Sequence, residues 1–404
     1  MASFLWTERA NFGPVARRGA AMAYDSVRGV TVMFGGEIVS GSATGDTWEW
    51  DGKEWAQVSD MGPDARVYAG MVFAADEKVC VLFGGVAGIS REVFGDTWRW
   101  DGTAWTEVLN SGPVARSSHG MAFDSNRNRV VLFGGSLADG TQLGDTWEFD
   151  GTAWTEQKAT GPSARSGLSM AYDDAGKRVV VFGGIDANAH ACGDTWTWDG
   201  QKWVQIAEFG PSARYSAAMS GGQGSLVLMG GTASGLVTPF LDTWQLGGNL
   251  WTQLENIGPG ALGEAASVLD SGRNVIVLFG GVMTASGTVT QATRVSGNTW
   301  EGPLPAALTP PGTVAVQSIT LQQVNQEQFA LTFNLTGPAP ASGVIVTLTL
   351  LSQGQVVGAP EPVTIPAKLT SFTIPLSFPA GLTGTLILSA QIAGTPAVST
   401  SVTL

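Results

Sequence analysis

The amino-acid sequence predicts an all-β protein of two domains, a ring of six small antiparallel sheets followed by a β-sandwich. Three observations carry this prediction. A Gly-Gly pair recurs six times at intervals of 47 to 50 residues, a tryptophan-containing segment follows each pair, and all 15 Trp residues lie before residue 301. Each repeat holds signals for four short strands, which is the content of one blade of a β-propeller.

Every repeat has the same order of elements. A Gly-Pro turn opens it, and in five of six copies an Arg stands three residues after the Pro. An alternating strand such as Gly120–Asp124 follows, then a polar turn, then a β-branched run into Phe-Gly-Gly. After a variable loop come Asp-Thr-Trp and a hairpin such as Trp98–Trp105, whose Asp-Gly turn supplies the positive φ angles that tight hairpins need.

These repeats resemble bacterial kelch repeats, whose pattern is MAYDS, then R.VVLFGG, then GDTWEWDG..W. The resemblance covers roughly residues 1 to 301, and the motifs keep their order in nearly every copy. It implies a six-bladed kelch-type β-propeller over residues 1–301, with the first strand of each blade lining a central channel. It also implies that ligands bind on the face formed by the inter-blade connections and the loops after Gly-Gly.

The spacing of Trp residues predicts how the ring closes. Seven residues separate the last Trp of a repeat from the next Gly-Pro, and the same distance separates Trp6 from Gly13. Trp6 is therefore expected on the outermost strand of the sixth blade, although Trp300 competes for that position. The sixth repeat is the least regular, with Ala292-Thr293-Arg294 expected at the Asp-Thr-Trp position and Leu262 in place of the Arg.

Residues 313–404 form the second predicted domain, after a Pro-rich linker at 302–312. Six β-rich runs with turn signals between them predict an antiparallel sandwich; the runs are VQSITL, FALTFNL, GVIVTLTLL, TSFTIPLSF, GTLILSAQI and VSTSVTL. The sequence of these runs resembles that of bacterial immunoglobulin-like modules of cell-surface and extracellular proteins. Such modules act as spacers, stalks or docking units, so the resemblance implies no chemistry in this domain.

Composition excludes several classes of function. The formal net charge of −13 argues against nucleic-acid binding, and no apolar stretch reaches the roughly 20 residues of a membrane helix. Two cysteines, Cys80 and Cys192, cannot build a disulfide framework, and Cys80 is expected to be buried. The segment Met1–Gly13 lacks the features of a signal peptide.

The repeated arginines are the first candidate binding residues. They would form a basic ring at the channel mouth, able to hold a carboxylate or sulfate; these residues are Arg17, Arg66, Arg116, Arg165 and Arg214. The alternative is structural, with each Arg bonding backbone carbonyls of the neighbouring blade.

Positions one to three residues after the arginine position vary between repeats and are the second set of candidates. They carry polar and aromatic side chains that could line a pocket for a sugar or a peptide side chain; these are Arg18, Tyr68, His119, Tyr215 and Glu264. The alternative is an ordinary wet channel. The repeated Trp and Met residues are expected to pack between sheets, and the Asp residues of Asp-Thr-Trp to bond the local backbone.

Enzymes that use a kelch propeller require particular residues at their sites. Copper-radical oxidases related to galactose oxidase also join a kelch propeller to an immunoglobulin-like domain, but they need a Tyr-His pair that this chain lacks. Nitrile-specifier-like proteins need a His where Trp100 stands after Glu92 and Asp96. Sialic-acid epimerases of the kelch type share six blades, so Arg with His or Glu at the mouth leaves that alternative open. No motif for a metal, a cofactor or a nucleophile is present.

The sequence therefore predicts a non-enzymatic recognition module of an extracellular or particle-surface protein. Its partner would be a glycan or a protein ligand on the propeller loop face, with the arginines favouring anionic groups, and the sandwich could hold an assembly partner. No nucleic-acid or membrane-spanning role is expected. Two alternatives stay open: a structural or adhesive component of a virion, tail or extracellular assembly, and a kelch-type enzyme that acts on an acidic sugar.

Overall fold

The computed structural model divides the chain into two units, Met1–Leu308 and Thr309–Leu404. It describes residues 5–10, 12–108, 112–207, 210–233, 239–254, 259–260, 262–284, 293–306, 316–323, 328–335, 344–352, 355–358, 363–366, 369–377, 385–392 and 398–403. Part of the predicted linker, 307–312, lies outside this range. The described residues form strands and turns without a helix, so none of them forms a helix that could cross a membrane.

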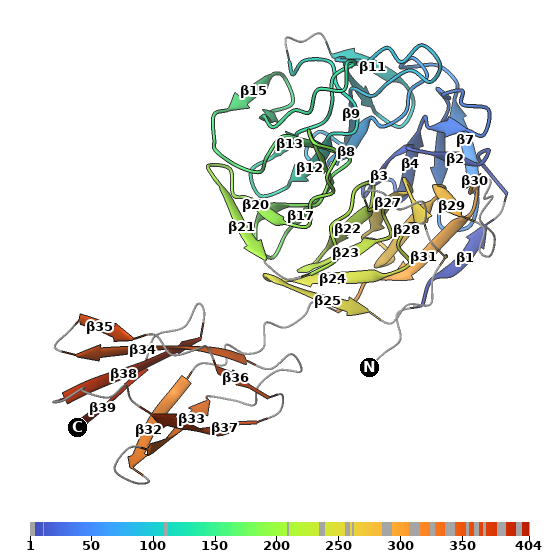
Figure 1. Ribbon diagram of the computed structural model, residues 1–404. Coiled ribbons are helices and arrows are strands. Elements are labelled where there is room, and N and C mark those ends of the chain that lie inside the picture. The colour runs from blue at the N-terminus through green and yellow to red at the C-terminus, as the bar shows by residue number, and fades with distance from the viewer. Residues whose placement is uncertain are drawn as a thin grey trace. The chain divides into compact units, whose positions relative to one another are not determined.

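Six four-stranded antiparallel sheets form a ring in the described part of the first unit (Figure 1). From the innermost strand outward, the first blade is β3 (Ala21–Asp25), β4 (Val30–Phe34), β6 (Thr47–Trp50) and β7 (Trp55–Ser59), and the second is β8 (Gly70–Ala74), β9 (Val79–Phe83), β10 (Thr97–Trp100) and β11 (Trp105–Val108). The third blade is β12 (Gly120–Asp124), β13 (Arg129–Phe133), β14 (Thr146–Phe149) and β15 (Trp154–Gln157), and the fourth is β17 (Ser169–Asp173), β18 (Arg178–Phe182), β20 (Thr195–Trp198) and β21 (Trp203–Ala207). The fifth blade is β22 (Ala218–Gly222), β23 (Ser225–Met229), β24 (Thr243–Gly247) and β25 (Leu250–Leu254), and the sixth is β27 (Ala266–Asp270), β28 (Val275–Phe279), β31 (Thr299–Pro303) and β1 (Thr7–Ala10). The predicted all-β propeller is confirmed, and each of the first five repeats supplies one blade.

The hairpins and the packing between blades follow from the repeated motif. Trp100 lies opposite Trp105 across the hairpin, and the turn is held by Asp101, whose Oδ1 accepts from the backbone N–H groups of Thr103 and Ala104. Tryptophans of the outermost strands then join neighbouring blades, since Trp154 Nε1 donates to Thr97 Oγ1 of the preceding blade at 3.0 Å. The same Trp-to-Thr bond links Trp55 to Thr299, Trp105 to Thr47, Trp203 to Thr146 and Trp251 to Thr195.

The sixth blade joins the two ends of the first unit. Its outermost strand is β1, which pairs antiparallel with β31, and Trp300 lies on β31, one strand further in. The expectation of Ala292–Arg294 at the Asp-Thr-Trp position is wrong. Asn298-Thr299-Trp300 occupies that position, because Trp300 pairs with Leu278 as Trp147 pairs with Leu132 in the third blade. Thr293 and Arg294 belong to a short side ladder instead, and Ala292 lies outside the described residues.

Short ladders lie beyond the innermost strands and connect each arginine segment to the residues after Gly-Gly. They are β2 (Arg17–Arg18) with β5 (Glu37–Ile38), β16 (Arg165–Ser166) with β19 (Ile185–Asp186), and β26 (Leu262–Gly263) with β29 (Val282–Thr284) and β30 (Thr293–Val295). Single bridges such as Tyr215 to Thr232 take their place in the other blades. The ladders hold the segments that carry the candidate site.

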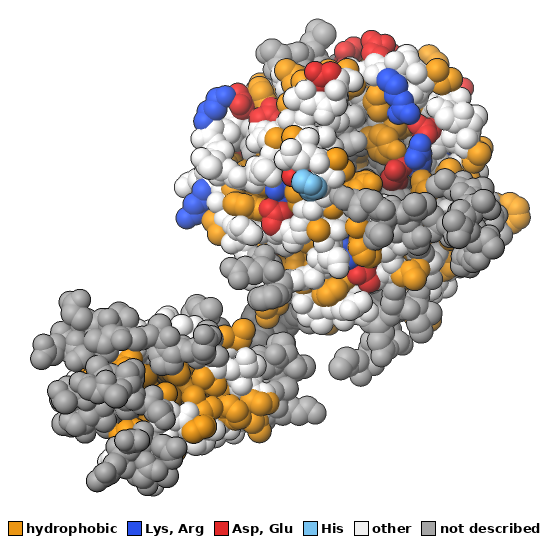
Figure 2. Space-filling view, viewed as in Figure 1, with side chains coloured by type: hydrophobic (Ala, Val, Ile, Leu, Met, Phe, Trp, Pro, Cys, Tyr) orange, Lys and Arg blue, Asp and Glu red, His pale blue; other side chains and the backbone are white. Residues whose placement is uncertain are grey.

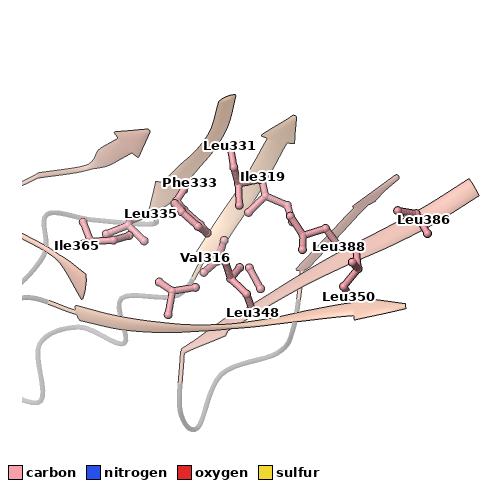
Figure 3. Close-up of a cluster of buried hydrophobic side chains, with 12 residues drawn as sticks. Val316, Ile319, Leu331, Phe333, Leu335, Leu348, Leu350, Ile365, Leu386 and Leu388 are labelled. Atoms are coloured by element: carbon pink, nitrogen blue, oxygen red, sulfur yellow. The ribbon is translucent and has the colours of Figure 1, made fainter. Parts of the chain in front are cut away.

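The second unit consists of two antiparallel sheets around one apolar core (Figure 3). One sheet is β32 (Val316–Gln323), β33 (Gln328–Leu335) and β37 (Ser371–Ser377); the other is β35 (Gln355–Gly358), β34 (Val344–Ser352), β38 (Thr385–Ile392) and β39 (Val398–Thr403), with β36 (Val363–Ile365) beside β34. Leu331 and Phe333 of the first sheet and Leu348 and Leu388 of the second are fully buried in this core. All six predicted runs contain strands. The immunoglobulin-like class of the second unit stays a prediction.

Candidate functional site

A closed circle of backbone hydrogen bonds surrounds the mouth of the channel. Its six members stand two residues after each arginine position: Gly19, Tyr68, Ser118, Gly167, Ser216 and Glu264. Each N–H donates to the carbonyl of the preceding member at 2.7 to 3.0 Å, and Gly19 N–H donates to Glu264 and so completes the circle. We call this circle the mouth ring.

All six members of the mouth ring adopt left-handed backbone conformations, with φ between 53° and 61°. Glycine occupies this region at little cost, whereas a side chain such as that of Tyr68 or Glu264 adopts it with strain of about 1–3 kcal/mol. Such strained positions cluster at functional sites. The mouth ring therefore has a uniform backbone that carries four different types of residue.

A cavity of about 190 Å³ lies at the mouth ring. Its lining consists of the ring members and the residue after each one, which are Ala20, Ala69, His119, Leu168, Ala217 and Ala265. Further along the innermost strands the channel opens into a second hollow of about 340 Å³, lined partly by the repeated methionines. The first strand of each blade thus lines the channel, as the resemblance implied.

The expected basic ring of arginines is wrong. The five side chains, of Arg17, Arg66, Arg116, Arg165 and Arg214, are at most 2% exposed. Each is held by the Asp of its own repeat; Arg116, for example, donates two bonds to Asp145 at 2.6 and 2.8 Å and further bonds to the carbonyls of Gly134 and Val114. The same two-pronged pairs join Arg17 to Asp46, Arg66 to Asp96, Arg165 to Asp194 and Arg214 to Asp242. The arginines are therefore structural, as the alternative expected, but the carbonyls that they bond belong to their own repeat and not to the neighbouring blade.

The Asp of each Asp-Thr-Trp motif therefore holds the buried arginine of its own repeat. The expectation that it bonds only the local backbone is wrong. In the first blade Asp46 accepts from Arg17 and from the indole N–H of Trp48, at 2.6 Å for the indole. Burial favours a higher pKa for Asp46, but the hydrogen bond and charge of Arg17 outweigh it and lower this pKa to about 2. Asp96, Asp145, Asp194 and Asp242 have lowered pKa values for the same reasons.

The sixth blade replaces both members of this ion pair by uncharged residues. Leu262 occupies the arginine position and is 4% exposed, and Asn298 occupies the aspartate position. The backbone is unchanged, since Asn298 still accepts from Gly280 N–H as Asp145 accepts from Gly134 N–H. Because the arginine and the aspartate are both replaced, no unpaired charge is left at this place in the sixth blade.

Three of the predicted site residues meet in one polar cluster. Arg18 Nη1 lies 3.2 Å from Glu264 Oε2, and the Tyr68 hydroxyl donates to the same oxygen at 2.7 Å. Arg18 also donates to Glu37 Oε1 through Nε and Nη2. Burial and the neighbouring charge of Glu264 raise the pKa of Tyr68. Burial acts to lower the pKa of Arg18, but its hydrogen bond to Glu37 and the charge of Glu264 outweigh that effect and raise it.

The sequence prediction missed Glu37, which is 4% exposed. Its signal was present, because Glu37 directly follows Gly-Gly where the second and third repeats carry Val86 and Ser136. Tyr215 was predicted but does not appear among the described residues that line the cavity. It faces Thr232 across a single bridge, one position outside the mouth ring.

His119 lies at the mouth, 7% exposed, and neither ring nitrogen has a hydrogen-bond partner among the described residues. The imidazole packs edge-on against Phe83, with ring centroids 5.5 Å apart. Burial, together with the charge of Arg116, lowers the pKa of His119 to about 3. At neutral pH the ring is therefore uncharged, and both of its nitrogens are buried without a partner among the described residues.

Replacing His119 by Leu is expected to remove part of the pH dependence of stability. His119 is uncharged in the folded chain down to about pH 3, whereas the unfolded chain gains a proton below about pH 6.5. Stability from this group is therefore complete above pH 6.5 and falls with pH toward 3. Between pH 7 and 5, wild type should lose about 2 kcal/mol more than His119→Leu. Urea unfolding at both pH values measures this difference, and equal losses would contradict it.

Comparison with known proteins identifies the class of fold. A family model described as the KLHDC2/KLHL20/DRC7 Kelch-repeats domain matches residues 101–281. The solved structure of YjhT is similar with a TM-score of 0.56 and 14% sequence identity, over 71% of this chain and 95% of that chain. No curated protein matches the chain. The first unit is thus a kelch-type β-propeller, and the likeness to YjhT shows the fold alone.

Proposed function

We propose that the propeller is a non-catalytic recognition module that binds a glycan or a protein ligand at the mouth ring. One observation carries this proposal. Six positions with the same left-handed backbone present Gly, Tyr, Ser, Gly, Ser and Glu around one cavity. The fold demands this backbone but not these side chains, and varied side chains on a rigid frame are how binding surfaces are built.

The charge distribution changes the expected ligand. The bias toward anions rested on five free guanidinium groups, and each of these is paired with an aspartate. Figure 2 agrees, because Lys and Arg side chains on the visible face are separated from one another, with acidic side chains near several of them. An anionic ligand therefore has no basic ring to meet at the mouth.

Binding is favoured over catalysis by the state of His119. A general base works best with a pKa near the operating pH, and burial lowers the pKa of His119 to about 3. Glu264 is already bonded to Arg18 and Tyr68. A Glu264 carboxylate held by these two partners suits a fixed polar binding surface better than it suits a catalytic group that must gain and lose a proton.

We further propose that the protein acts outside a cell or on the surface of a particle. The support is the two-sheet second unit, whose sequence resembles surface modules. In this setting the second unit would act as a spacer or docking part. The propeller would carry the recognition.

The proposal is tested with an array of glycans and peptides and a variant that keeps the backbone of the mouth ring. Tyr68→Gly with Glu264→Gly makes these positions like Gly19 and Gly167, which have the same φ. We expect ligands of the wild type to lose roughly tenfold or more in affinity, because the few residues that dominate an interface, among which Tyr is enriched, each cost about 2 kcal/mol or more when truncated.

The matched control makes the same kind of backbone change at the other end of the innermost strands. Lys78 and Lys177 lie in the first turn of their blades with φ of 56° and 50°, where Gly29 stands in the first blade. Lys78→Gly with Lys177→Gly should leave array binding unchanged. Equal binding by the wild type and both double variants would overturn the mouth ring as the ligand site.

A further inference from the structure

The charged side chains at the mouth do not cancel one another. Arg18, Glu37 and Glu264 form a cluster of one positive and two negative groups, so its formal net charge is −1. Arg18 donates to Glu37 through two nitrogens, Nε at 3.1 Å and Nη2 at 2.5 Å, whereas a single longer contact of 3.2 Å joins its Nη1 to Glu264. The charge of Arg18 is therefore offset mainly by Glu37, and the uncompensated negative charge lies on Glu264.

Glu264 is the member of this cluster that lines the mouth cavity. Its side chain is 23% exposed, whereas that of Glu37 is 6% exposed and is not among the described lining residues. Both hydrogen bonds to the Glu264 carboxylate, from Arg18 and from the Tyr68 hydroxyl, end on Oε2. The other oxygen, Oε1, has no partner among the described residues and is not buried. An accessible carboxylate oxygen is thus left for a ligand.

The backbone of Glu264 indicates that this carboxylate is kept for a purpose. Its φ of 58° lies in the left-handed region, at a ring position where the first and fourth blades have Gly19 and Gly167 with φ of 61° and 60°. Glycine adopts this region at little cost, so the fold does not require a side chain here. Strain that a side chain retains is typical of functional sites.

Small apolar and hydroxyl side chains line the rest of the cavity. Ser118 and Ser216 are half-buried and bring hydroxyl groups. Leu168 and four alanines bring apolar groups; the alanines are Ala20, Ala69, Ala217 and Ala265. Among the described lining residues Glu264 is the one with a full charge, because His119 is uncharged at neutral pH. The best match to this cavity is a ligand with an apolar stem and a positively charged end.

We propose that the mouth cavity binds a lysine side chain of a protein ligand, with the ammonium group on Oε1 of Glu264. This inference rests on the proposed function and names the ligand class within it. A lysine has three N–H donors at the end of an aliphatic stem, and Glu264 with the hydroxyls of Ser118 and Ser216 offers acceptors for them. The bond from ammonium to carboxylate is charge-assisted, whereas an anionic group would meet Glu264 without a free cation beside it.

The test uses pentapeptides of the form Gly-Gly-Xaa-Gly-Gly with both termini blocked, in which Xaa is lysine, acetyl-lysine, norleucine or glutamate. Acetylation removes the charge of lysine and keeps its stem. The chain has four tyrosines, so NMR signals of labelled tyrosine rings report on Tyr68 directly, and Tyr68→Phe assigns them. Tyr24 and Tyr172 line the second hollow and serve as internal references.

We expect the lysine peptide to shift the Tyr68 signals and to leave those of Tyr24 and Tyr172 unchanged. The other three peptides should bind roughly tenfold more weakly or worse, because hydrogen bonds to charged groups are the stronger ones. This comparison is made on the wild type and so does not depend on how any variant folds.

Glu264→Gln keeps the shape of the side chain and an acceptor for Tyr68 but removes the charge, so it should lower the affinity for the lysine peptide roughly tenfold or more. Glu77→Gln is the matched control. Glu77 also belongs to an ion pair, with Arg99 at 2.8 Å, but it lies in the turn after β8, at the other end of the innermost strands. Glu77→Gln should bind the lysine peptide as the wild type does.

Equal binding of the lysine and acetyl-lysine peptides, or unchanged lysine affinity in a folded Glu264→Gln protein, would overturn the inference. Tighter binding of methyl glucosaminide than of the lysine peptide would also overturn it, because the ammonium group would then come from an amino sugar. If no lysine peptide binds while the array still detects a ligand that needs Tyr68 and Glu264, this inference fails and the proposed function stands.

Discussion

Replacement of Arg116 by Leu is expected to lower the free energy of unfolding by roughly 3 kcal/mol, because it removes several buried hydrogen bonds and leaves the Asp145 carboxylate, whose side chain is 25% exposed, without its partner. Arg116 is fully buried and donates two bonds to Asp145. Asp145→Asn should cost more, roughly 3–5 kcal/mol, because it leaves the fully buried charge of Arg116 without its partner. Equilibrium unfolding in urea, monitored by tryptophan fluorescence, measures both effects.

The double variant Arg116→Leu with Asp145→Asn should recover most of this loss, to within about 1–2 kcal/mol of wild type. The chain itself supplies the template, since Leu262 and Asn298 hold these positions in the sixth blade. Recovery would show that the ion pair specifies the blade and adds little net stability. A double variant as unstable as the sum of the single ones would contradict this account.

Trp6→Ala is the second change with a large expected effect, about 3–5 kcal/mol of destabilisation. Trp6 is 4% exposed and packs in a cluster with Val227, Leu262 and Leu278. It directly precedes β1, the outermost strand of the sixth blade. The loss therefore removes packing at the point where the two ends of the propeller sequence meet.

Arg9→Ala is the matched control for the same strand. Arg9 pairs with Glu301 at 2.9 Å, but its side chain is 49% exposed, so its removal should cost less than about 1 kcal/mol. Thermal unfolding of both variants compares the two contributions. A Trp6→Ala protein as stable as Arg9→Ala would show that β1 does not hold the ring closed.

The blades were predictable from the sequence because their signals are local. Gly-Gly, Asp-Thr-Trp and the Asp-Gly turn lie within one repeat, and strand pairing within a blade follows from them. The sixth repeat was misassigned because Asn298 stands where Asp was expected. The Asn-Thr-Trp sequence kept its place in the sheet, since Thr299 and Trp300 supply the packing.

The site was only partly predictable because its contacts join distant residues. Each buried arginine finds its aspartate 28 to 30 positions later, and residues repeated in five of the six copies gave no sign of being paired. Arg18 and Glu264 are 246 positions apart. Variation between repeats did identify Tyr68, His119 and Glu264 as candidates, but the circle that brings them together exists only once the ring has closed.

The backbone of the mouth ring builds the fold, and we propose that its side chains bind the ligand. The direct test measures stability and affinity on the same variant, Tyr68→Gly with Glu264→Gly. Relief of strain at φ of 55° and 58° should offset the lost hydrogen bond, which leaves the free energy of unfolding within about 1–2 kcal/mol of wild type. Affinity for the ligand found on the array should fall roughly tenfold or more. Unchanged affinity in a protein that has lost stability would contradict the account.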